Sequence, residues 1–309
     1  MTRKSKSDMV HPLSAISPTR EVFAFETLAA RERAVPRKIS ERMVLDNLLP
    51  SELLALQSEL AMEGDTLSAK VREILDQVVK NYSVSIFRDL QYPAQLREVG
   101  HALPLFYFRG DLSLLTNRCV SVVGARKATE FGLKRARKLG SELAKHGFTV
   151  ISGLARGIDT AAMAAAIKAG GNVVGVIGTP IDQSYPKENS EFQEYIAQHH
   201  LLVSEVPFVR YATEHWKLRR LYFPARNETM SALSEATVIV EASDTSGTLT
   251  QARAALKQGR KLFILDSCFD NPNISWPKRF EDKGAVRLHT VEQLLENLGP
   301  GTRKNEQAG

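Results

Sequence analysis

The chain has 309 residues, of which 43% are hydrophobic and 25% are charged, as is usual for a soluble globular protein. Its 41 Lys and Arg residues exceed its 35 Asp and Glu residues by six, and this mild basicity permits a phosphate-rich partner without requiring one. The apolar runs are too short to span a membrane, no secretion signal is recognised, and two distant cysteines, Cys119 and Cys268, exclude a disulfide framework and a zinc ribbon, so we expect a cytoplasmic protein.

The N-terminal part of the chain divides into two segments. Residues 1–38 are polar and basic without sustained periodicity, which predicts a mostly flexible tail with at most one short helix near Val22–Arg33. Between residues 39 and 80 apolar residues recur at helical spacing, which predicts a small helical module. We expect the main domain to follow over residues 81–298, and a flexible tail over residues 299–309.

Strand and helix patterns alternate in the main domain from Cys119 onwards. Short apolar runs predict the strands Cys119–Val123, Thr149–Ile151, Val173–Ile177, Leu201–Val203, Thr237–Val240 and Leu262–Leu265. Helical patterns cover Phe131–His146, Asp159–Ala169, Ser190–His199, Arg226–Leu233 and Leu249–Gln258, and glycines suited to left-handed C-caps stand at Gly147, Gly170 and Gly259. The alternation predicts an α/β fold, a doubly wound, mainly parallel sheet with helices on both faces.

The loops at the carboxyl ends of the predicted strands are the candidate site, because ligands of a doubly wound sheet bind there. Glycine and small hydroxyl residues gather at 124–129, 152–159, 178–182 and 243–248, before helix N-termini that can hold an anion, and Tyr185 and Pro186 follow the third of these loops. The alternative is that the glycines only make turns and the hydroxyl residues only cap helices. Neither a GxGxxG fingerprint nor a GxxxxGK[ST] loop occurs, which disfavours a dehydrogenase or an ATPase.

A second basic segment lies further along the chain. It carries the cations Arg210, Lys217, Arg219, Arg220 and Arg226, interleaved with the aromatic residues Tyr211, Trp216, Tyr222 and Phe223. Cations for phosphates and ring faces for bases are the ingredients of single-stranded nucleic-acid binding. The alternative is an exposed loop whose rings anchor it to the sheet. On the helix predicted over Phe131–His146 we interpret the cations Lys134, Arg135, Arg137 and Lys138 as a solvated face.

The sequence shows no metal-binding motif and no activated nucleophile. His199 and His200 adjoin without the spacing of a zinc helix, and no GxSxG elbow occurs. Glu205 and Glu241 end predicted strands, where a carboxylate can act in acid–base chemistry but more often holds loop amides or an arginine. We therefore expect no metal, no cofactor and no catalytic residue.

Several motifs, present together and in order, resemble the DprA/Smf family of DNA-processing proteins. They are Phe87–Arg97, Leu105–Asp111, GARKAT at 124–129, SGLARGID at 152–159, FPARN at 223–227 and SGTL at 246–249. The resemblance implies an extended Rossmann fold, a basic pocket for single-stranded DNA, and a homodimer. It also implies that the DNA is handed to RecA in natural transformation, recombination, or a related DNA-handling or defence role.

The resemblance also implies which residues bind DNA. Arg126 corresponds to the main phosphate-binding arginine of the family, and Arg220 to a basic residue three positions before Phe223, whose ring can pack on a base. The full set is Gly124, Arg126, Lys127, Ser152, Gly153, Arg156, Arg220, Phe223, Arg226, Asn227, Ser246 and Gly247. The chain departs from the family at Glu228, where arginine is usual, and at Ala125, where serine is usual. No winged helix and no clear helix–hairpin–helix glycine pattern is recognised, which bears on duplex binding, affinity and the RecA partnership.

Other proteins of the wider Rossmann superfamily provide the alternatives, a nucleotide-ligand sensor or a nucleoside-phosphate phosphoribohydrolase. The hydrolases carry PGGxGTxxE with a catalytic glutamate, and Gln251 stands at that position in this chain. An amide cannot ionise or transfer the proton, so hydrolysis is disfavoured although nucleotide binding is not. A structural subunit with a vestigial pocket is a third alternative, against which Arg126 and Arg226 argue.

Overall fold

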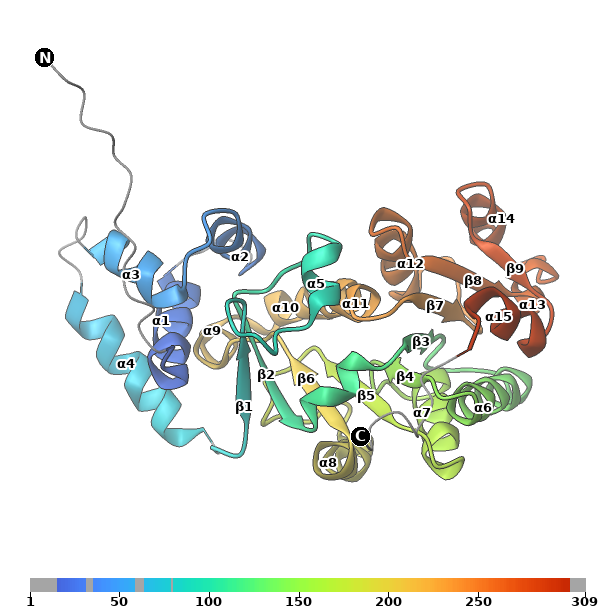
Figure 1. Cartoon of the computed structure of the whole chain (residues 1–309), viewed down its shortest axis with the longest axis horizontal. Helices are drawn as coiled ribbons and strands as arrows, with labels where there is room; N and C mark the ends of the chain where they lie inside the picture. The colour runs from blue at the N-terminus through green and yellow to red at the C-terminus, as the bar shows by residue number, and fades with distance from the viewer. Residues whose placement is uncertain (1–15, 32–35, 59–63, 79, 301–309) are drawn as a thin grey trace, which may run out of the picture.

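The strands of the chain form one nine-stranded sheet with helices packed against it (Figure 1). The computed structural model describes residues 16–31, 36–58, 64–78 and 80–300. The strands are β1 (Ser83–Ile86), β2 (Leu105–Gly110), β3 (Cys119–Val123), β4 (Thr149–Ser152), β5 (Val173–Ile177), β6 (Leu201–Ser204), β7 (Ala236–Ile239), β8 (Lys261–Leu265) and β9 (Val286–Leu288). Their order across the sheet is β1-β2-β6-β5-β4-β3-β7-β8-β9.

The sheet is mainly parallel. All neighbouring strands from β6 to β9 in this order run parallel, whereas β2 pairs antiparallel with both β1 and β6. The order of the strands along the chain reverses between β3 and β7, so the loops at their carboxyl ends leave in opposite directions and open a crevice. The predicted α/β, doubly wound, Rossmann-like fold is confirmed.

Helices connect the strands and cover both faces of the sheet. They are α1 (Pro18–Arg31), α2 (Pro36–Leu45), α3 (Pro50–Ser58), α4 (Gly64–Gln77), α5 (Ala94–Glu98), α6 (Glu130–Lys145), α7 (Ile158–Lys168), α8 (Ser190–His199), α9 (Phe208–Thr213), α10 (Trp216–Arg219), α11 (Tyr222–Ala232), α12 (Thr248–Lys257), α13 (Asp266–Phe269), α14 (Trp276–Glu281) and α15 (Val291–Leu298), with the 3-10 helices η1 (Leu112–Thr116) and η2 (Lys187–Asn189). Side chains of α6, α7 and α8 share one core, and side chains of α11 and α12 share the other. Among the described residues no helix is both long and apolar enough to cross a membrane.

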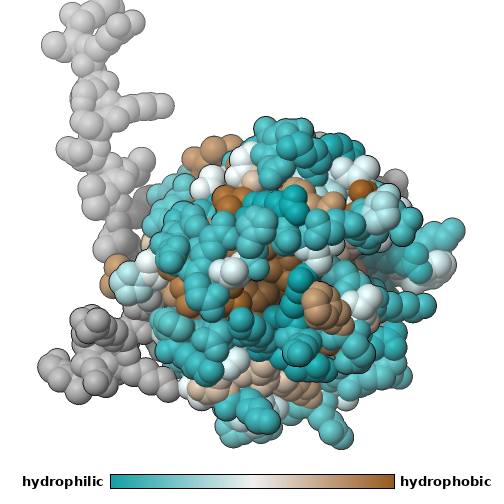
Figure 2. All heavy atoms as spheres, turned by 90° about the vertical axis from the view of Figure 1, so that its right-hand side faces the viewer, coloured by the Kyte–Doolittle hydropathy of each residue, from teal (hydrophilic) through white to brown (hydrophobic). Residues whose placement is uncertain are grey.

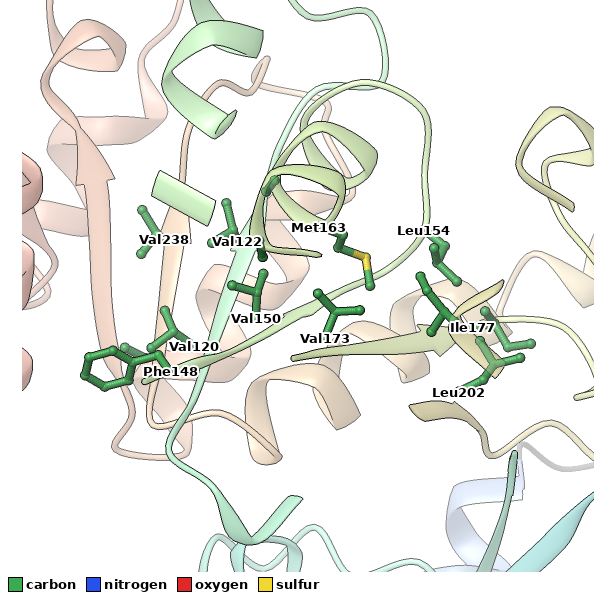
Figure 3. Packing of buried hydrophobic residues seen from close by; sticks show 14 of the residues in the cluster. Val120, Val122, Phe148, Val150, Leu154, Met163, Val173, Ile177, Leu202 and Val238 are labelled. Atoms are coloured by element: carbon green, nitrogen blue, oxygen red, sulfur yellow. The ribbon is translucent and has the colours of Figure 1, made fainter. Parts of the chain in front are cut away.

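Successive residues of a strand point to opposite faces, and both faces of the central strands are buried. Val120 and Val122 of β3 pack with Met163 of α7 in the first core, which Figure 3 shows from close by. Cys119 and Val123 of the same strand lie in the second core. This burial on both sides explains why these strands read as continuous apolar runs and not as alternating patterns.

The predicted elements between Cys119 and Leu265 are confirmed. The six predicted strands are β3 to β8, and each end agrees within one residue. Four of the five predicted helices agree as closely, while α11 begins at Tyr222 and not at Arg226, because proline is tolerated in a first helical turn and Pro224 stands there. The three C-cap glycines have the expected positive φ, at Gly147 (79°), Gly170 (76°) and Gly259 (67°).

Helix α1 corresponds to the short helix that the sequence allowed near Val22–Arg33, but it begins at Pro18 and packs against the sheet. Its apolar side chains share the core that contains β2. The buried carboxylate of Glu26 accepts a hydrogen bond of 2.5 Å from the Tyr107 hydroxyl on β2. The N–H groups of Phe208 and Val209, at the start of α9, donate to the same carboxylate at 2.9 Å. Burial raises the pKa of Glu26 to about 7.

The helical module expected over residues 39–80 is present as α2, α3 and α4. The predicted C-terminal tail begins at Gly299, which directly follows α15 and has a φ of 73°. Residues 1–15, 32–35 and 301–309, on which the rest of the tail predictions falls, lie outside the described residues.

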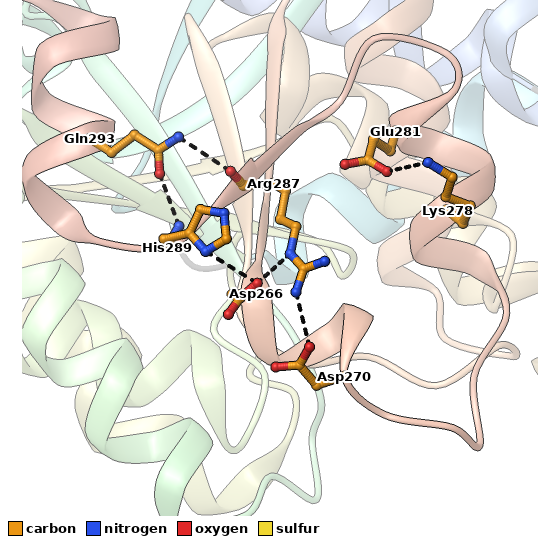
Figure 4. A network of polar contacts seen from close by, with 7 residues as sticks. All are labelled: Asp266, Asp270, Lys278, Glu281, Arg287, His289 and Gln293. Atoms are coloured by element: carbon orange, nitrogen blue, oxygen red, sulfur yellow. Dashed lines mark hydrogen bonds and ion pairs between the residues drawn. The ribbon is translucent and has the colours of Figure 1, made fainter.

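The C-terminal elements lie at one end of the molecule, whose surface is mainly hydrophilic around a group of hydrophobic residues (Figure 2). Charged contacts hold the short strand β9 there (Figure 4). The Arg287 guanidinium donates to Asp266, and to Asp270 at 2.9 Å. Nδ1 of His289 lies 3.3 Å from Asp266, whose pKa Arg287 lowers. The apolar pattern of the sequence does not record such contacts, and β9 was not predicted.

Candidate nucleic-acid interface

The loops after β3, β4 and β7 meet at the crevice, and one buried carboxylate joins two of them. The N–H of Gly124 donates to Oδ1 of Asp159 at 3.4 Å, and the N–H of Gly153 donates to Oδ2 at 3.1 Å. Burial raises the pKa of Asp159. The N–H of Ala125 donates to the carbonyl oxygen of Glu241, after β7, at 2.7 Å. These contacts fix the backbone of the loops at the carboxyl edge of the sheet.

Arg226 of α11 is buried against the same loops. Its Nη1 donates to the carbonyl oxygens of Gly153 at 2.6 Å and Val176 at 2.7 Å. A Cβ at position 153 would lie only 1.9 Å from that nitrogen, so the glycine leaves the space that the guanidinium fills. Burial lowers the pKa of Arg226 to about 10, and the side chain therefore stays protonated at neutral pH.

A small cavity borders Arg226. It has a volume of about 30 Å³ and is lined by Arg126, Gly153, Ala155, Arg156, Tyr185, Pro186, Phe223 and Arg226. The ring centroids of Tyr185 and Phe223 are 5.4 Å apart, and the Arg126 guanidinium lies 5.9 Å from the Phe223 centroid. Arg126 and Arg156 are exposed. A cavity of this volume holds only one or two water-sized groups, so a larger ligand would have to lie across its rim.

The basic segment between residues 210 and 226 separates into a buried part and an exposed part. Arg210 is buried, and its guanidinium lies 3.1 Å from the carboxylate of Glu214. Trp216 is 54% exposed, and the guanidinium of Arg220 lies 4.8 Å from its ring centroid. The segment is therefore an anchor at one end and an exposed cation–aromatic surface at the other.

Comparison with known proteins identifies the family. Residues 83–299 match the family model of DNA recombination-mediator protein A. The chain belongs to this family. DNA processing protein DprA of Bacillus subtilis is 34% identical over 245 residues, which cover 79% of this chain and 80% of that protein. DprA of Streptococcus pneumoniae is 38% identical over 183 residues, 59% of this chain and 62% of that protein. The resemblance to the DprA/Smf family is confirmed.

Two solved structures of DprA proteins share the fold. The X-ray structure of DprA from Streptococcus pneumoniae matches with a TM-score of 0.72 and 26% identity, over 91% of this chain and 98% of that chain. The structure of DprA from Helicobacter pylori, which binds single-stranded DNA, matches with a TM-score of 0.58 and 28% identity, over 70% and 95% of the two chains. Because the first match covers 91% of this chain, it extends beyond the sheet and includes part of the N-terminal helices.

The structure brings together five of the site residues that the DprA/Smf resemblance implied. Those that line the cavity are Arg126, Gly153, Arg156, Phe223 and Arg226. Lys127 is exposed in the same loop as Arg126, and Arg220 is exposed at the end of α10. Gly124, the first residue of that loop, packs against α7, since an added Cβ would lie 2.7 Å from the side chain of Ile158.

The remaining implied residues hold the loops together. The fully buried hydroxyl of Ser152 donates to the carbonyl oxygen of Val122 in β3 at 2.7 Å, so this side chain does not reach the cavity, and a contact of its backbone with DNA stays a prediction. Nδ2 of Asn227 donates to the carbonyl oxygen of Gly247 at 3.0 Å. The Ser246 hydroxyl accepts the N–H of Thr248 at 3.2 Å. These three side chains hold the loops of the candidate site together.

Tyr185 and Pro186 line the cavity although the sequence did not assign them to the site. Tyr185 is 49% exposed and packs against Phe223. An added Cβ at Gly178 would lie 2.8 Å from the Phe223 ring, so glycine at this position of the loop after β5 leaves room for that ring. The position of Tyr185, an aromatic residue that follows the loop after the third predicted strand, could have indicated from the sequence that it belongs to the site.

The described residues that line the cavity include no carboxylate. Glu241 accepts a hydrogen bond of 2.8 Å from the Thr129 hydroxyl, and so holds the start of α6. Gln251 is fully buried, with Nε2 lying 3.3 Å from Oγ1 of Thr237. Glu228, where the family usually has arginine, lines a different cavity beside α9, α10 and α11. The cavity therefore presents cations and rings to a ligand.

Proposed function

We propose that this protein binds single-stranded DNA across the rim of the cavity. The observation that carries the proposal is the exposed Arg126 beside the rings of Phe223 and Tyr185 at the carboxyl edge of the sheet. A guanidinium grips a phosphate through paired hydrogen bonds, and a ring face stacks on a base. Membership of the family, and the single-stranded DNA binding of DprA from Helicobacter pylori, support the same ligand.

The cations of the rim contact phosphates, and its aromatic rings contact bases. Arg126 and Lys127 contact phosphates, while Arg156 contributes less because it lies 3.6 Å from the Glu188 carboxylate. Trp216 with Arg220 provides a second cation–aromatic contact. Stacking requires a splayed base, and the bases of a duplex are stacked on one another, so the rings favour single strands.

The wider role that we propose is the one the DprA/Smf resemblance implies. The protein protects the bound strand and hands it to a recombinase of the RecA type, in natural transformation, recombination, or a related DNA-handling or defence role. It works as a homodimer in the cytoplasm. It is a binding protein and not an enzyme, which the cation-lined cavity supports. Family membership supports the other parts of this role.

Fluorescence anisotropy with labelled single-stranded DNA, duplex, RNA and mononucleotides, each titrated over salt, tests the proposal. We expect single-stranded DNA to bind more tightly than duplex. Its affinity falls steeply with salt because bound phosphates release counterions. Equal affinity for duplex at matched salt, or an affinity independent of salt, contradicts the proposal. Tightest binding of a mononucleotide favours the nucleotide-sensor alternative.

Arg126→Ala is the decisive variant. It weakens the binding of single-stranded DNA and lowers the salt slope by about 0.7, because one phosphate contact on a single strand is lost. Arg20→Ala, at an exposed arginine of α1, is the matched control and binds as the parent does. Circular dichroism verifies that both variants are folded. A folded Arg126→Ala protein with the parent's isotherm shows that Arg126 does not bind phosphate.

A further inference from the structure

Helices α6 and α7 lie side by side on the outer side of one core, and their backbones approach closely. A Cβ at Gly140 of α6 would lie 2.1 Å from the carbonyl oxygen of Ala162 in α7. Outside this contact an open groove of about 920 Å³ runs between the helices. The groove is lined by Leu133, Arg137, Lys138, Ser141, Lys145, Gly157, Thr160, Ala161, Ala164, Ala165, Lys168 and Ala169.

All charged residues that line the groove are cations. Arg137, Lys138 and Lys168 are exposed, and none of them forms an ion pair in the described part of the chain. Lys145 at the far end pairs with Glu142 at 2.8 Å. The pKa of Glu292 in α15 is lowered mainly by a hydrogen bond to its own backbone and by Thr290, and the charge of Lys138 adds a smaller contribution. The groove therefore attracts an anionic partner.

The uncharged lining residues are mostly small. Serine, threonine, alanine and glycine side chains let an extended chain lie close to the helices, and the described lining contains no aromatic ring. The cavity differs in this respect, because Tyr185 and Phe223 stand at its rim. The chemistry of the groove therefore suits phosphates and does not suit stacked bases.

The groove begins next to the cavity, although no described residue lines both. Gly157, which lines the groove, follows Arg156, which lines the cavity. A Cβ at Gly157 would lie 2.4 Å from the carbonyl oxygen of Ala125 and 2.8 Å from that of Arg126, so the groove begins against the Arg126 loop. From there α6 continues away from the cavity, and its rise of about 1.5 Å per residue places Lys145 roughly 22 Å beyond Glu130.

We propose that the α6–α7 groove is a phosphate track that carries the same single strand away from the cavity, an inference that rests on the proposed DNA binding. Arg137, Lys138 and Lys168 contact phosphates of nucleotides beyond those held at the rim. The bases there point to solvent, so this part of the contact is independent of sequence. The cations of α6 then do more than form the solvated face that the sequence suggested.

The triple variant Arg137→Ala/Lys138→Ala/Lys168→Ala tests the track. Alanine is the most favourable residue in a helix, so the helices are preserved. The triple control Arg20→Ala/Lys257→Ala/Lys283→Ala removes the same charge at exposed positions outside the groove and the cavity. Anisotropy is measured across salt with a short dT strand of about five nucleotides and a long dT strand of about thirty, which lie near the lower end of the usual range of site sizes and above its upper end.

We expect the triple variant to bind the short strand as the parent does. It binds the long strand more weakly, with a salt slope lower by about 2, because each lost phosphate contact on a single strand removes about 0.7. The control leaves both slopes unchanged. An equal loss of long-strand binding in the control, or an unchanged slope in the triple variant, overturns the track.

Two further outcomes separate this inference from the proposed function. If Arg126→Ala weakens both strands while the triple variant weakens neither, the proposed function stands and the track does not exist. If the parent binds neither strand, the proposed function itself fails. A triple variant that keeps full long-strand binding but loses the parent's binding of polyglutamate shows that the groove receives an acidic protein segment, which also overturns the track.

Discussion

The rim and the floor of the cavity use the same type of side chain for different purposes. On the rim, Arg126 is exposed and lies beside the Phe223 ring. The floor is formed by the buried side chains of Arg226 and Asp159. Arg226 donates to two backbone carbonyl groups, one of them that of Gly153. Both arginines stand in motifs of the same family, one hundred positions apart. The difference teaches that burial, and not the motif, decides whether an arginine holds the fold or meets the ligand.

A fixed floor has a benefit for the rim. Asp159 and Arg226 hold the loops in place by hydrogen bonds to their backbone. In the proposed DNA binding the loops then lose little conformational entropy, and the exposed side chains keep more of their interaction energy as affinity. The comparison predicts that changes in the floor reduce stability, whereas changes on the rim reduce binding alone.

The largest expected effect is a loss of stability in Arg226→Met. Methionine keeps the length of the side chain but leaves two buried carbonyl groups without their donor and removes the positive charge near Asp159. We expect the free energy of unfolding to fall by about 3 kcal/mol or more, measured by urea denaturation. A variant with the parent's midpoint that no longer binds DNA would place Arg226 on the rim and break the comparison.

A smaller effect is expected on the rim. Phe223→Ala removes a stacking surface, and the binding of single-stranded DNA weakens roughly 5- to 150-fold, which corresponds to about 1–3 kcal/mol per stacked base. Anisotropy at fixed salt measures it. Phe23→Ala, at a partly buried phenylalanine of α1, is the control for the loss of a ring elsewhere. Equal affinities of the two variants would show that Phe223 is only a packing residue.

No effect is expected in the last test, which follows from the proposed role as a binding protein. Incubation with AMP, GMP, CMP or UMP releases no free base on chromatography, since the described lining holds no carboxylate and Gln251 is buried. General acid–base help is worth about 10² to 10⁴ in rate, so its loss leaves little turnover. Base release that disappears in Glu241→Gln would instead identify a hydrolase.

The sequence predicted the central sheet well because its signal is local. Strands β3 to β8 are apolar on both faces, and glycines mark the ends of their helices. The sequence allowed a short helix where α1 lies but did not predict its packing, because part of the buried surface of α1 is polar. Glu21 accepts hydrogen bonds from the N–H and hydroxyl of Ser51, and Glu26 from β2 and α9. Such partners are distant in the sequence, so no periodicity reveals them.

The sequence predicted part of the candidate site, since five of the twelve implied residues line the cavity, and their binding of DNA stays a prediction. The motifs identified Arg126, Phe223 and Arg226, since glycine loops and basic residues are visible in a sequence. They did not show that Arg226 and Ser152 are buried, because burial depends on which loops surround a side chain in the fold. Tyr185 was missed for the same reason, since its loop follows another strand.

The buried carboxylate of Glu26 has a consequence for how the chain divides. It ties α1 to β2 and α9, and the apolar side chains of α1, α3 and β2 share one core. A cut near residue 80 therefore does not release two independent folding units. A fragment over residues 81–298 would leave the hydroxyl of Tyr107 and the N–H groups of Phe208 and Val209 without their acceptor.

Glu26 also couples this attachment to the proton concentration. Burial raises its pKa from 4.5 to about 7, so between these values the folded protein holds a proton that the unfolded chain releases. The free energy of unfolding therefore falls as the pH rises from 4.5 to 7, by on the order of 3 kcal/mol. Thermal melts across this range should show a shallower dependence in Glu26→Gln, and equal slopes would contradict the coupling. Mild acidification thus stabilises the packing of the N-terminal helices on the sheet, because the proton acts as a ligand that binds only the folded protein.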